Sequence, residues 1–275
     1  MSVSRIASLL SSTLVRASRS SRFRSLVDQM LEDGEARDFL LHRLGTRQLH
    51  DAERIDARLP STVQETDDFE DLLWLLSSNY ANRGIALLML EEAAWLYDTI
   101  KALESPRVAE LGRAKGGTTF LMASAGARVL SLENGALEAA NARHFGAPEI
   151  SYDEALGNAL TKVGISSRVE VLQADAETYP VPSEMFDLVF SDIALSDHRM
   201  AMMFERWWEG VKPGGRFVLR DGREPRTPTV RRLAKSLEGR PDIHFEEPAP
   251  GVFSVLVKVS GDVAPPPPAE SRAIG

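Results

Sequence analysis

The chain has 275 residues and a formal net charge of −8, and 43% of its residues are hydrophobic. The length allows one large domain with an extension, and the acidic balance argues against a general nucleic-acid binder, which needs a basic surface against phosphate. The absence of cysteine excludes disulfides, cysteine-ligated metal sites and a cysteine nucleophile, and no apolar run reaches the roughly 18 residues of a membrane-spanning helix.

The N-terminal part differs in composition from the rest. Residues 1–27 hold five arginines, nine serines and no acid. Three interpretations fit: a helix that packs on the domain, a basic helix that touches a membrane surface or a partner, and an organelle transit peptide. We favour the first and expect a cytoplasmic protein, with organelle targeting as the alternative. Apolar residues at helical spacing predict a helical extension over residues 1–75.

Strand and helix patterns alternate after this extension. A helix is predicted over 84–103, and further helices near 118–125, 153–163, 197–211 and 229–238. The predicted strands are Arg107–Leu111, Arg128–Leu132, Val169–Gln173, Phe186–Ser191, Arg216–Leu219, His244–Glu247 and Val252–Val259. Such alternation is typical of an α/β fold, a doubly wound, Rossmann-like parallel sheet with helices on both faces.

The end of the chain departs from this alternation. The last two predicted strands are separated only by Pro248–Gly251. A parallel crossover needs a dozen or more residues, so these strands must pair antiparallel. The sequence thus predicts a seven-stranded sheet with a reversed last strand, in a domain that spans 76–261. A proline-rich tail over 262–275 is expected to be disordered.

A glycine-rich stretch follows the first predicted strand and reads Glu110-Leu-Gly112-Arg-Ala-Lys-Gly116-Gly117-Thr118. Its glycines are spaced by four and one, which differs from the two and three of the dinucleotide fingerprint, and no Gly-Lys-Ser/Thr follows. Glu110 would repel a pyrophosphate but suits a cationic ligand. A tight structural turn is the alternative interpretation of this stretch alone.

Two further acids end the next two strands. Glu133 ends the second strand and can accept hydrogen bonds from ribose hydroxyls. Asp175 follows the third strand, where it can contact the exocyclic amine of a purine. The ends of parallel strands share one edge of a sheet, so these acids and Glu110 predict a pocket for a cationic, adenosine-like cofactor.

These motifs, with Phe186-Asp-Leu-Val-Phe-Ser-Asp192 and Val211-Lys-Pro-Gly-Gly-Arg-Phe-Val-Leu, resemble class I S-adenosylmethionine-dependent methyltransferases over about residues 80–260. The loop spacing is most similar to the catechol and caffeoyl-CoA O-methyltransferases and to the cephalosporin-hydroxylase-like and macrocin-type group. The resemblance implies that the glycine loop wraps the methionine part of the cofactor. It places these residues in the cofactor site: Glu110, Gly112, Gly116, Gly117, Thr118, Glu133, Asp175 and Asp192.

The reaction centre has two alternatives. In metal-using relatives, acids at the ends of the fourth and fifth strands hold Mg²⁺, which implies Asp192 and Asp221 as metal ligands here. Arg220 departs from that pattern, because its guanidinium opposes a dication. His198 is the other candidate, as a general base, although it also fits a solvated residue in the first turn of a helix.

The sequence therefore predicts an S-adenosylmethionine-dependent methyltransferase that methylates oxygen of a small-molecule or sugar-containing metabolite. Asp192, His198 and Asp221 are its candidate catalytic residues. The alternative is a methyltransferase-fold binding or scaffold subunit without turnover, and a nicotinamide-dependent oxidoreductase is disfavoured by the glycine spacing. The expected partner is a small-molecule acceptor and no nucleic acid, with a homo-oligomer left open.

Overall fold

The computed structural model describes residues 66–76, 85–139, 150–225 and 227–259. The chain divides into two compact units, and the first of them, Met1–Ile55 with Ser78–Arg83, lies outside the described residues. Most of the predicted helical extension and the proline-rich tail also lie outside them, so the proposed domain boundaries stay predictions. The description below concerns the second unit, Asp56–Ser77 with Gly84–Gly275.

A seven-stranded sheet with the order β3-β2-β1-β4-β5-β7-β6 forms the centre of this unit. The strands from β1 to β5 pair in parallel, while β7 pairs antiparallel with both β5 and β6. The predicted fold, including the reversed last strand, is confirmed. The strands are β1 (Arg107–Leu111), β2 (Arg128–Glu133), β3 (Val169–Gln173), β4 (Phe186–Ser191), β5 (Val211–Leu219), β6 (Ile243–Phe245) and β7 (Ser254–Lys258).

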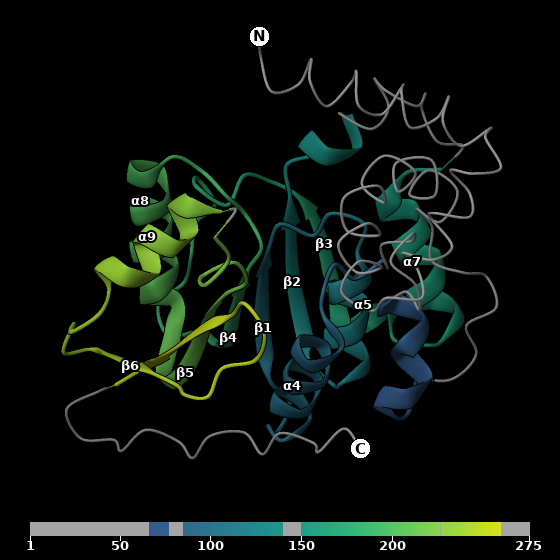
Figure 1. The fold of residues 1–275 in the computed structure, drawn as a ribbon. Coiled ribbons are helices and arrows are strands. Elements are labelled where there is room, and N and C mark those ends of the chain that lie inside the picture. The colour runs from purple at the N-terminus through teal and green to yellow at the C-terminus, as the bar shows by residue number, and fades with distance from the viewer. Residues whose placement is uncertain (1–65, 77–84, 140–149, 226, 260–275) are drawn as a thin grey trace, which may run out of the picture. The chain divides into compact units, whose positions relative to one another are not determined.

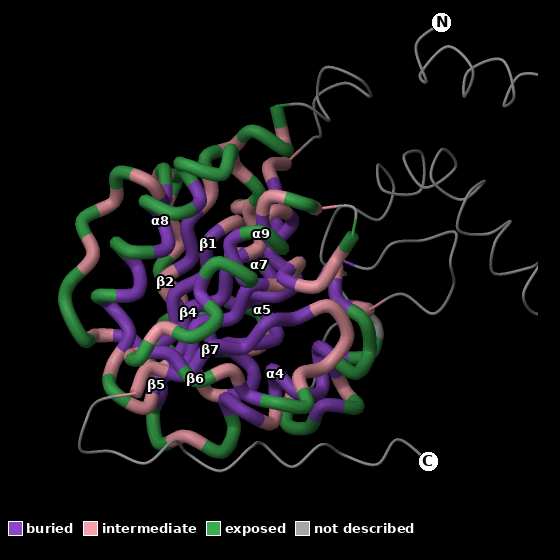
Figure 2. Tube along the Cα trace, turned by 60° about the vertical axis from the view of Figure 1, so that its left-hand side comes forward, coloured by how far each residue is buried: buried purple, intermediate pink, exposed green. Residues whose placement is uncertain are grey.

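Helices cover the two faces of the sheet, with α4, α5 and α7 on one side and α8 and α9 on the other (Figure 1). Each face has its own apolar core, and the central strands are buried between the two cores (Figure 2). The helices are η1 (Phe69–Leu76), α4 (Leu90–Lys101), α5 (Gly117–Ser124), α7 (Tyr152–Lys162), η2 (Ser166–Arg168), α8 (Asp197–Gly210) and α9 (Pro228–Ser236). No helix in this part of the chain is long and apolar enough to cross a membrane.

The segment before α4 is not helical, although the sequence predicts a helix over 84–103. The helix begins only at Leu90, where the Glu92 carboxylate accepts a hydrogen bond from the Met89 N–H at 2.9 Å. Upstream, the Ala86 N–H bonds the Leu75 carbonyl at 3.0 Å, which joins this segment to η1. The segment is therefore held by a backbone hydrogen bond to η1 rather than by helical hydrogen bonds of its own.

Gly117 allows that segment to cross the start of α5 in close contact. A Cβ atom added at Gly117 would lie 2.2 Å from the Ala86 nitrogen and 2.4 Å from the Ile85 carbonyl carbon. Both are backbone atoms, so no side-chain rotation would relieve the overlap. The close backbone contact thus explains why a glycine is needed at position 117. The sequence alone does not reveal this contact.

The β3–β4 connection contains no helix. Residues 174–185 join the two strands as turns and irregular chain. Tyr179 from this connection stacks on Trp207 of α8, whose Nε1 donates a hydrogen bond to the Ala176 carbonyl at 2.8 Å. The α8 face of β2 and β3 is therefore covered by a loop, and Leu130 and Leu172 on that face stay partly exposed.

Substituting Gly117→Ala should destabilise the domain by about 1–3 kcal/mol or more, because the new methyl group overlaps two backbone atoms. Gly157→Ala in α7 is the matched control. A Cβ there meets no atom within 4 Å, so helix propensity should stabilise the domain by roughly 0.5–1 kcal/mol. Thermal and urea denaturation measure both effects, and equal stability of the two variants would contradict the close crossing.

Candidate functional site

A cleft of about 340 Å³ opens where the parallel strands end. Each of strands β1 to β5 contributes the residues that directly follow it or end it. Ligand pockets of α/β sheets typically lie at this edge, and the volume is within the usual range for a small ligand. The lining residues are Leu87, Gly112, Ala114, Leu132, Glu133, Asn134, Ala136, Leu137, Ala174, Asp175, Ala176, Glu177, Asp192, Ile193, Ala194, Leu195 and Arg220.

The glycine loop contributes two small residues, Gly112 and Ala114, to the lining of the cleft. Gly112 has φ +89°, and a Cβ on it would lie 2.6 Å from Ile193 Cγ2 and 2.8 Å from the Asp192 carbonyl oxygen. Ala114 takes φ +50°, a left-handed conformation that is uncommon for alanine. The position where the dinucleotide fingerprint has its second glycine therefore keeps a glycine-like conformation with a methyl group.

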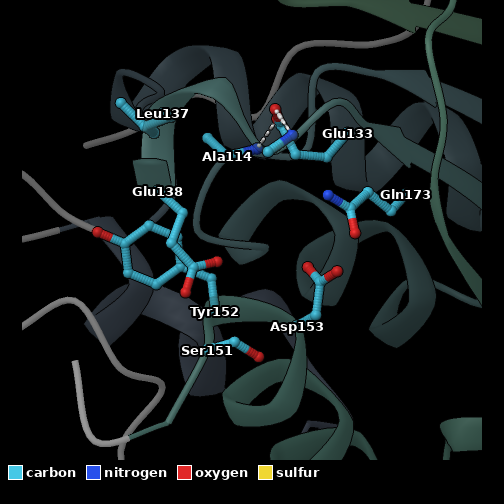
Figure 3. Close-up of a pocket in the computed structure, with 9 residues that line it drawn as sticks. Ala114, Glu133, Leu137, Glu138, Ser151, Tyr152, Asp153 and Gln173 are labelled. Atoms are coloured by element: carbon cyan, nitrogen blue, oxygen red, sulfur yellow. Dashed lines mark hydrogen bonds between the residues drawn. The ribbon is translucent and has the colours of Figure 1, made fainter. Parts of the chain in front are cut away.

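Glu133 anchors the loop. Its carboxylate accepts hydrogen bonds from the Ala114 N–H at 2.9 Å and from the Gly135 N–H at 3.1 Å, as Figure 3 shows. Two carboxylate oxygens offer about four acceptor positions, so Glu133 can still accept hydrogen bonds from a ligand. It also borders a smaller pocket of about 140 Å³, next to Glu138 and Tyr152 (Figure 3).

Asp175 lies at the outer end of the cleft, just after β3. Its Oδ1 accepts a hydrogen bond from the Glu177 N–H at 2.9 Å, which fixes the orientation of the carboxylate. Glu177 in turn pairs with Arg199 of α8. Asp175 is exposed, so its carboxylate can accept a further hydrogen bond from an amine in the cleft.

Asp192 and Arg220 form the opposite end of the cleft. Arg220 donates a hydrogen bond to Asp192 Oδ1 at 3.0 Å and another to the Leu87 carbonyl, and its guanidinium lies 3.8 Å from Asp221 Oδ1. Burial raises the pKa of Asp192, and the Arg220 charge opposes that rise. The guanidinium thus ties the segment before α4 to the ends of β4 and β5.

The predicted metal pair does not fit this geometry. Arg220 places its positive charge beside both Asp192 and Asp221, where a dication would be repelled. The Asp221 carboxylate is further engaged by Thr227, whose hydroxyl donates a hydrogen bond at 2.9 Å. Within the residues that the structure describes, no group of three acids or histidines could hold a metal ion.

Glu110 lies beneath the loop and is fully buried. Its Oε2 accepts hydrogen bonds from Thr119 of α5 and, at 2.6 Å, from Ser131 of β2. Burial raises the pKa of Glu110 to about 7, and the two hydroxyl donors and the Arg113 charge only partly oppose that rise. This acid therefore joins β1, β2 and α5 and does not line the cleft.

The cleft brings together only some of the predicted site residues: Gly112, Glu133, Asp175 and Asp192. Gly116, Gly117 and Thr118 form the buried start of α5 outside its lining. His198 is exposed in the first turn of α8 and is not a lining residue either, so the solvated alternative describes it better than a general base. Asp221 also lies outside the lining.

Two arginines make contacts that the sequence did not reveal. Arg113 looks like a solvated loop charge or a partner for a cofactor carboxylate, but it is 3% exposed. It forms a two-pronged ion pair with Asp153 of α7 at 2.7 and 2.8 Å and donates a hydrogen bond to the Ser131 carbonyl at 2.7 Å. Arg220 lines the cleft. Asp153 and Asp192, the acidic partners of these two arginines, are distant from them in the sequence. Residue spacing therefore does not predict either ion pair.

The fold is an α/β fold with an open cleft at the carboxyl edge of its sheet, which is where ligands of such folds typically bind. Residues 109–219 match the family described as "Methyltransferase domain". The match agrees with the resemblance drawn from the motifs over this segment. No curated protein sequence matches the chain.

Several solved structures are similar to this chain at low identity. A methyltransferase from Geobacter sulfurreducens is 17% identical over 63% of this chain and 81% of its own, with a TM-score of 0.48. An S-adenosylmethionine-dependent O-methyltransferase from Thermotoga maritima is 18% identical over 63% and 66%, with a TM-score of 0.43. The O-methyltransferase TomG from Streptomyces achromogenes is 18% identical over 63% and 82%, with a TM-score of 0.45. Similarities at this level carry no conclusion about the acceptor.

Glu110→Gln should change how stability depends on pH. The pKa of Glu110 rises from 4.5 unfolded to about 7 folded, so the folded state binds the proton more tightly and loses stability as pH rises through this window. Glutamine does not titrate. The variant should therefore gain roughly 3 kcal/mol of unfolding free energy relative to the native chain between pH 5 and pH 8. Urea denaturation at several pH values measures the difference, and a difference that stays constant would refute the buried carboxylate.

Proposed function

We propose that this protein transfers the methyl group of S-adenosylmethionine to an oxygen atom of a small-molecule or sugar-containing acceptor. The observation that carries the proposal is a single cleft in which Glu133, Asp175 and Asp192 follow three different parallel strands. The methyltransferase domain supplies the class of reaction, and the cleft supplies residues whose chemistry suits each part of that cofactor.

The residues fit the cofactor part by part. Glu133 can accept hydrogen bonds from both ribose hydroxyls, because the two backbone N–H groups use only part of its acceptor capacity. Asp175 can accept a hydrogen bond from the adenine amine, beside the small side chains of Ala174 and Ala176. Gly112 leaves backbone exposed for close approach of the methionine part.

When bound, S-adenosylmethionine supplies a methyl group on a positively charged sulfur atom. The chain contributes positioning: a rigid cleft holds the reactants in line, which removes much of the entropic barrier. Asp192 lies at the Leu87 and Ile193 end of the cleft, and burial raises its pKa, which makes its carboxylate a stronger base toward an acceptor hydroxyl. Arg220 keeps that carboxylate oriented.

Glu133→Gln should weaken binding of S-adenosylhomocysteine by roughly 10- to 100-fold, since one or two charge-assisted hydrogen bonds are lost. Isothermal titration calorimetry measures the change. Glu138→Gln is the matched control, because Glu138 borders the smaller pocket and not the cleft. Absence of binding to the native chain at millimolar ligand would sink the proposed function, whereas equal affinities of the native chain and the Glu133 variant would remove only Glu133 from the site.

Magnesium should have no effect on cofactor binding, because Arg220 already supplies a positive charge between Asp192 and Asp221. The affinity for S-adenosylhomocysteine in excess magnesium chloride should equal that in EDTA. A gain of roughly tenfold in magnesium would show that the arginine gives way to a metal ion.

A further inference from the structure

A second groove, of about 870 Å³, lies at the opposite edge of the sheet, where the strands begin. Its walls are the starts of β1, β2 and β3 and the non-helical chain before β4. The cofactor cleft lies at the ends of the same strands, so the two hollows are on opposite edges. The lining residues are Ser105, Arg107, Gly126, Arg128, Val129, Leu130, Ser167, Arg168, Val169, Glu170, Tyr179, Pro182, Met185 and Phe186.

The groove exists because the β3–β4 connection has no helix. Both faces of a parallel sheet are normally covered by crossover helices. Here residues 174–185 cover the β2 and β3 end of the face only with a loop, through Tyr179 and Met185. Leu130 is left at the floor of an open hollow.

Three arginines stand in one row across this edge. Arg107 and Arg128 are direct partners in the β1–β2 register. Arg168 is the last residue of η2 and directly precedes Val169, which pairs with Val129, so it lies beside Arg128 at the start of β3. Neighbouring strands lie about 4.8 Å apart, so the row spans roughly 10 Å. The like charges of the row repel one another, and a bound anion would relieve that repulsion.

The acid nearest to the row is Asp187, whose carboxylate accepts a hydrogen bond from the Arg107 backbone N–H at 2.8 Å. Arg107 and Arg128 are exposed, and their side chains form no ion pair with the other described residues. Arg168 donates a hydrogen bond to the Ala123 carbonyl, which carries no formal charge. Glu170 is the acid in the lining, and nearby Asp187 is engaged by Lys212 at 2.7 Å. Three guanidinium groups and one carboxylate leave a net charge of about +2 in the groove.

Two serine residues add possible hydrogen-bond donors for an anionic ligand. The hydroxyl groups of Ser105 and Ser167 line the groove beside the arginines. Ser105 takes φ +48°, a left-handed conformation that is uncommon for a residue other than glycine. Guanidinium forks and hydroxyl donors together suit tetrahedral phosphate oxygens, which accept paired hydrogen bonds from arginine.

We propose that this groove binds the diphosphate or triphosphate group of a small ligand, held by Arg107, Arg128 and Arg168. A row of cations about 10 Å long matches a short chain of phosphates better than a single anion. The apolar floor formed by Leu130, Tyr179 and Met185 can hold an organic group attached to that chain. The site is separate from the cofactor cleft and does not depend on the proposed methyl transfer.

Calorimetric titration of the full chain with inorganic tripolyphosphate at low salt tests the proposal. Binding should weaken by roughly tenfold or more in Arg107→Met and in Arg128→Met, because each removes charge-assisted hydrogen bonds without removing the aliphatic stem. Arg232→Met is the matched control, since this exposed arginine pairs with Asp197 on the outer surface of α8 and α9 and should leave binding unchanged. Melting temperatures check that each variant is folded.

Three results would overturn the proposal: no heat at millimolar tripolyphosphate, equal affinities of the native chain and both arginine variants, or equally tight binding of hexaglutamate, which would indicate an acidic peptide site. Adenosine triphosphate provides a further arm. Tighter binding of the nucleotide than of tripolyphosphate supports an attached organic group on the apolar floor, and equal binding supports a site for the phosphate chain alone. Affinity for S-adenosylhomocysteine should be the same in all these variants.

Discussion

One buried carboxylate holds the carboxyl edge of the parallel sheet together. Glu110 ends β1 with no exposed surface and accepts hydrogen bonds from Thr119 of α5 and Ser131 of β2. Burial of a carboxylate is costly, and its pKa near 7 reflects that cost. In return, one side chain of β1 holds β2 and α5 in place through its hydrogen bonds. The glycine loop, which contributes Gly112 and Ala114 to the cleft, runs between two of these joined elements, β1 and α5.

The loop above Glu110 is held in the same manner, by polar groups that reach across the fold. Glu133 accepts a hydrogen bond from the Ala114 N–H, and Arg113 forms an ion pair with Asp153 of α7. At the other end of the cleft, Arg220 donates hydrogen bonds to both Asp192 and the Leu87 carbonyl, and so joins the segment before α4 to the end of β4. The cleft walls are thus tied together by charge-assisted hydrogen bonds, which are stronger than neutral ones and need partners at defined angles.

The two edges of the sheet differ in charge for a topological reason. Parallel strands end at one edge, where Glu133, Asp175 and Asp192 gather, and begin at the other, where Arg107, Arg128 and Arg168 stand. The first edge suits a cationic ligand and the second an anionic one. The missing helix between β3 and β4 leaves the second edge open. One sheet therefore presents two hollows of opposite charge, although the chain as a whole carries −8.

The sequence by itself determined the strands, their alternation with helices, the reversed last strand and the acids that end β2, β3 and β4. These follow from local patterns: apolar runs, turn residues and a connection too short for a crossover. Only the tertiary structure decided which of those residues share the cleft. It buried Glu110, exposed His198 and placed Arg220 between two acids. Such contacts join residues far apart in the chain, and their geometry depends on packing that no local pattern encodes.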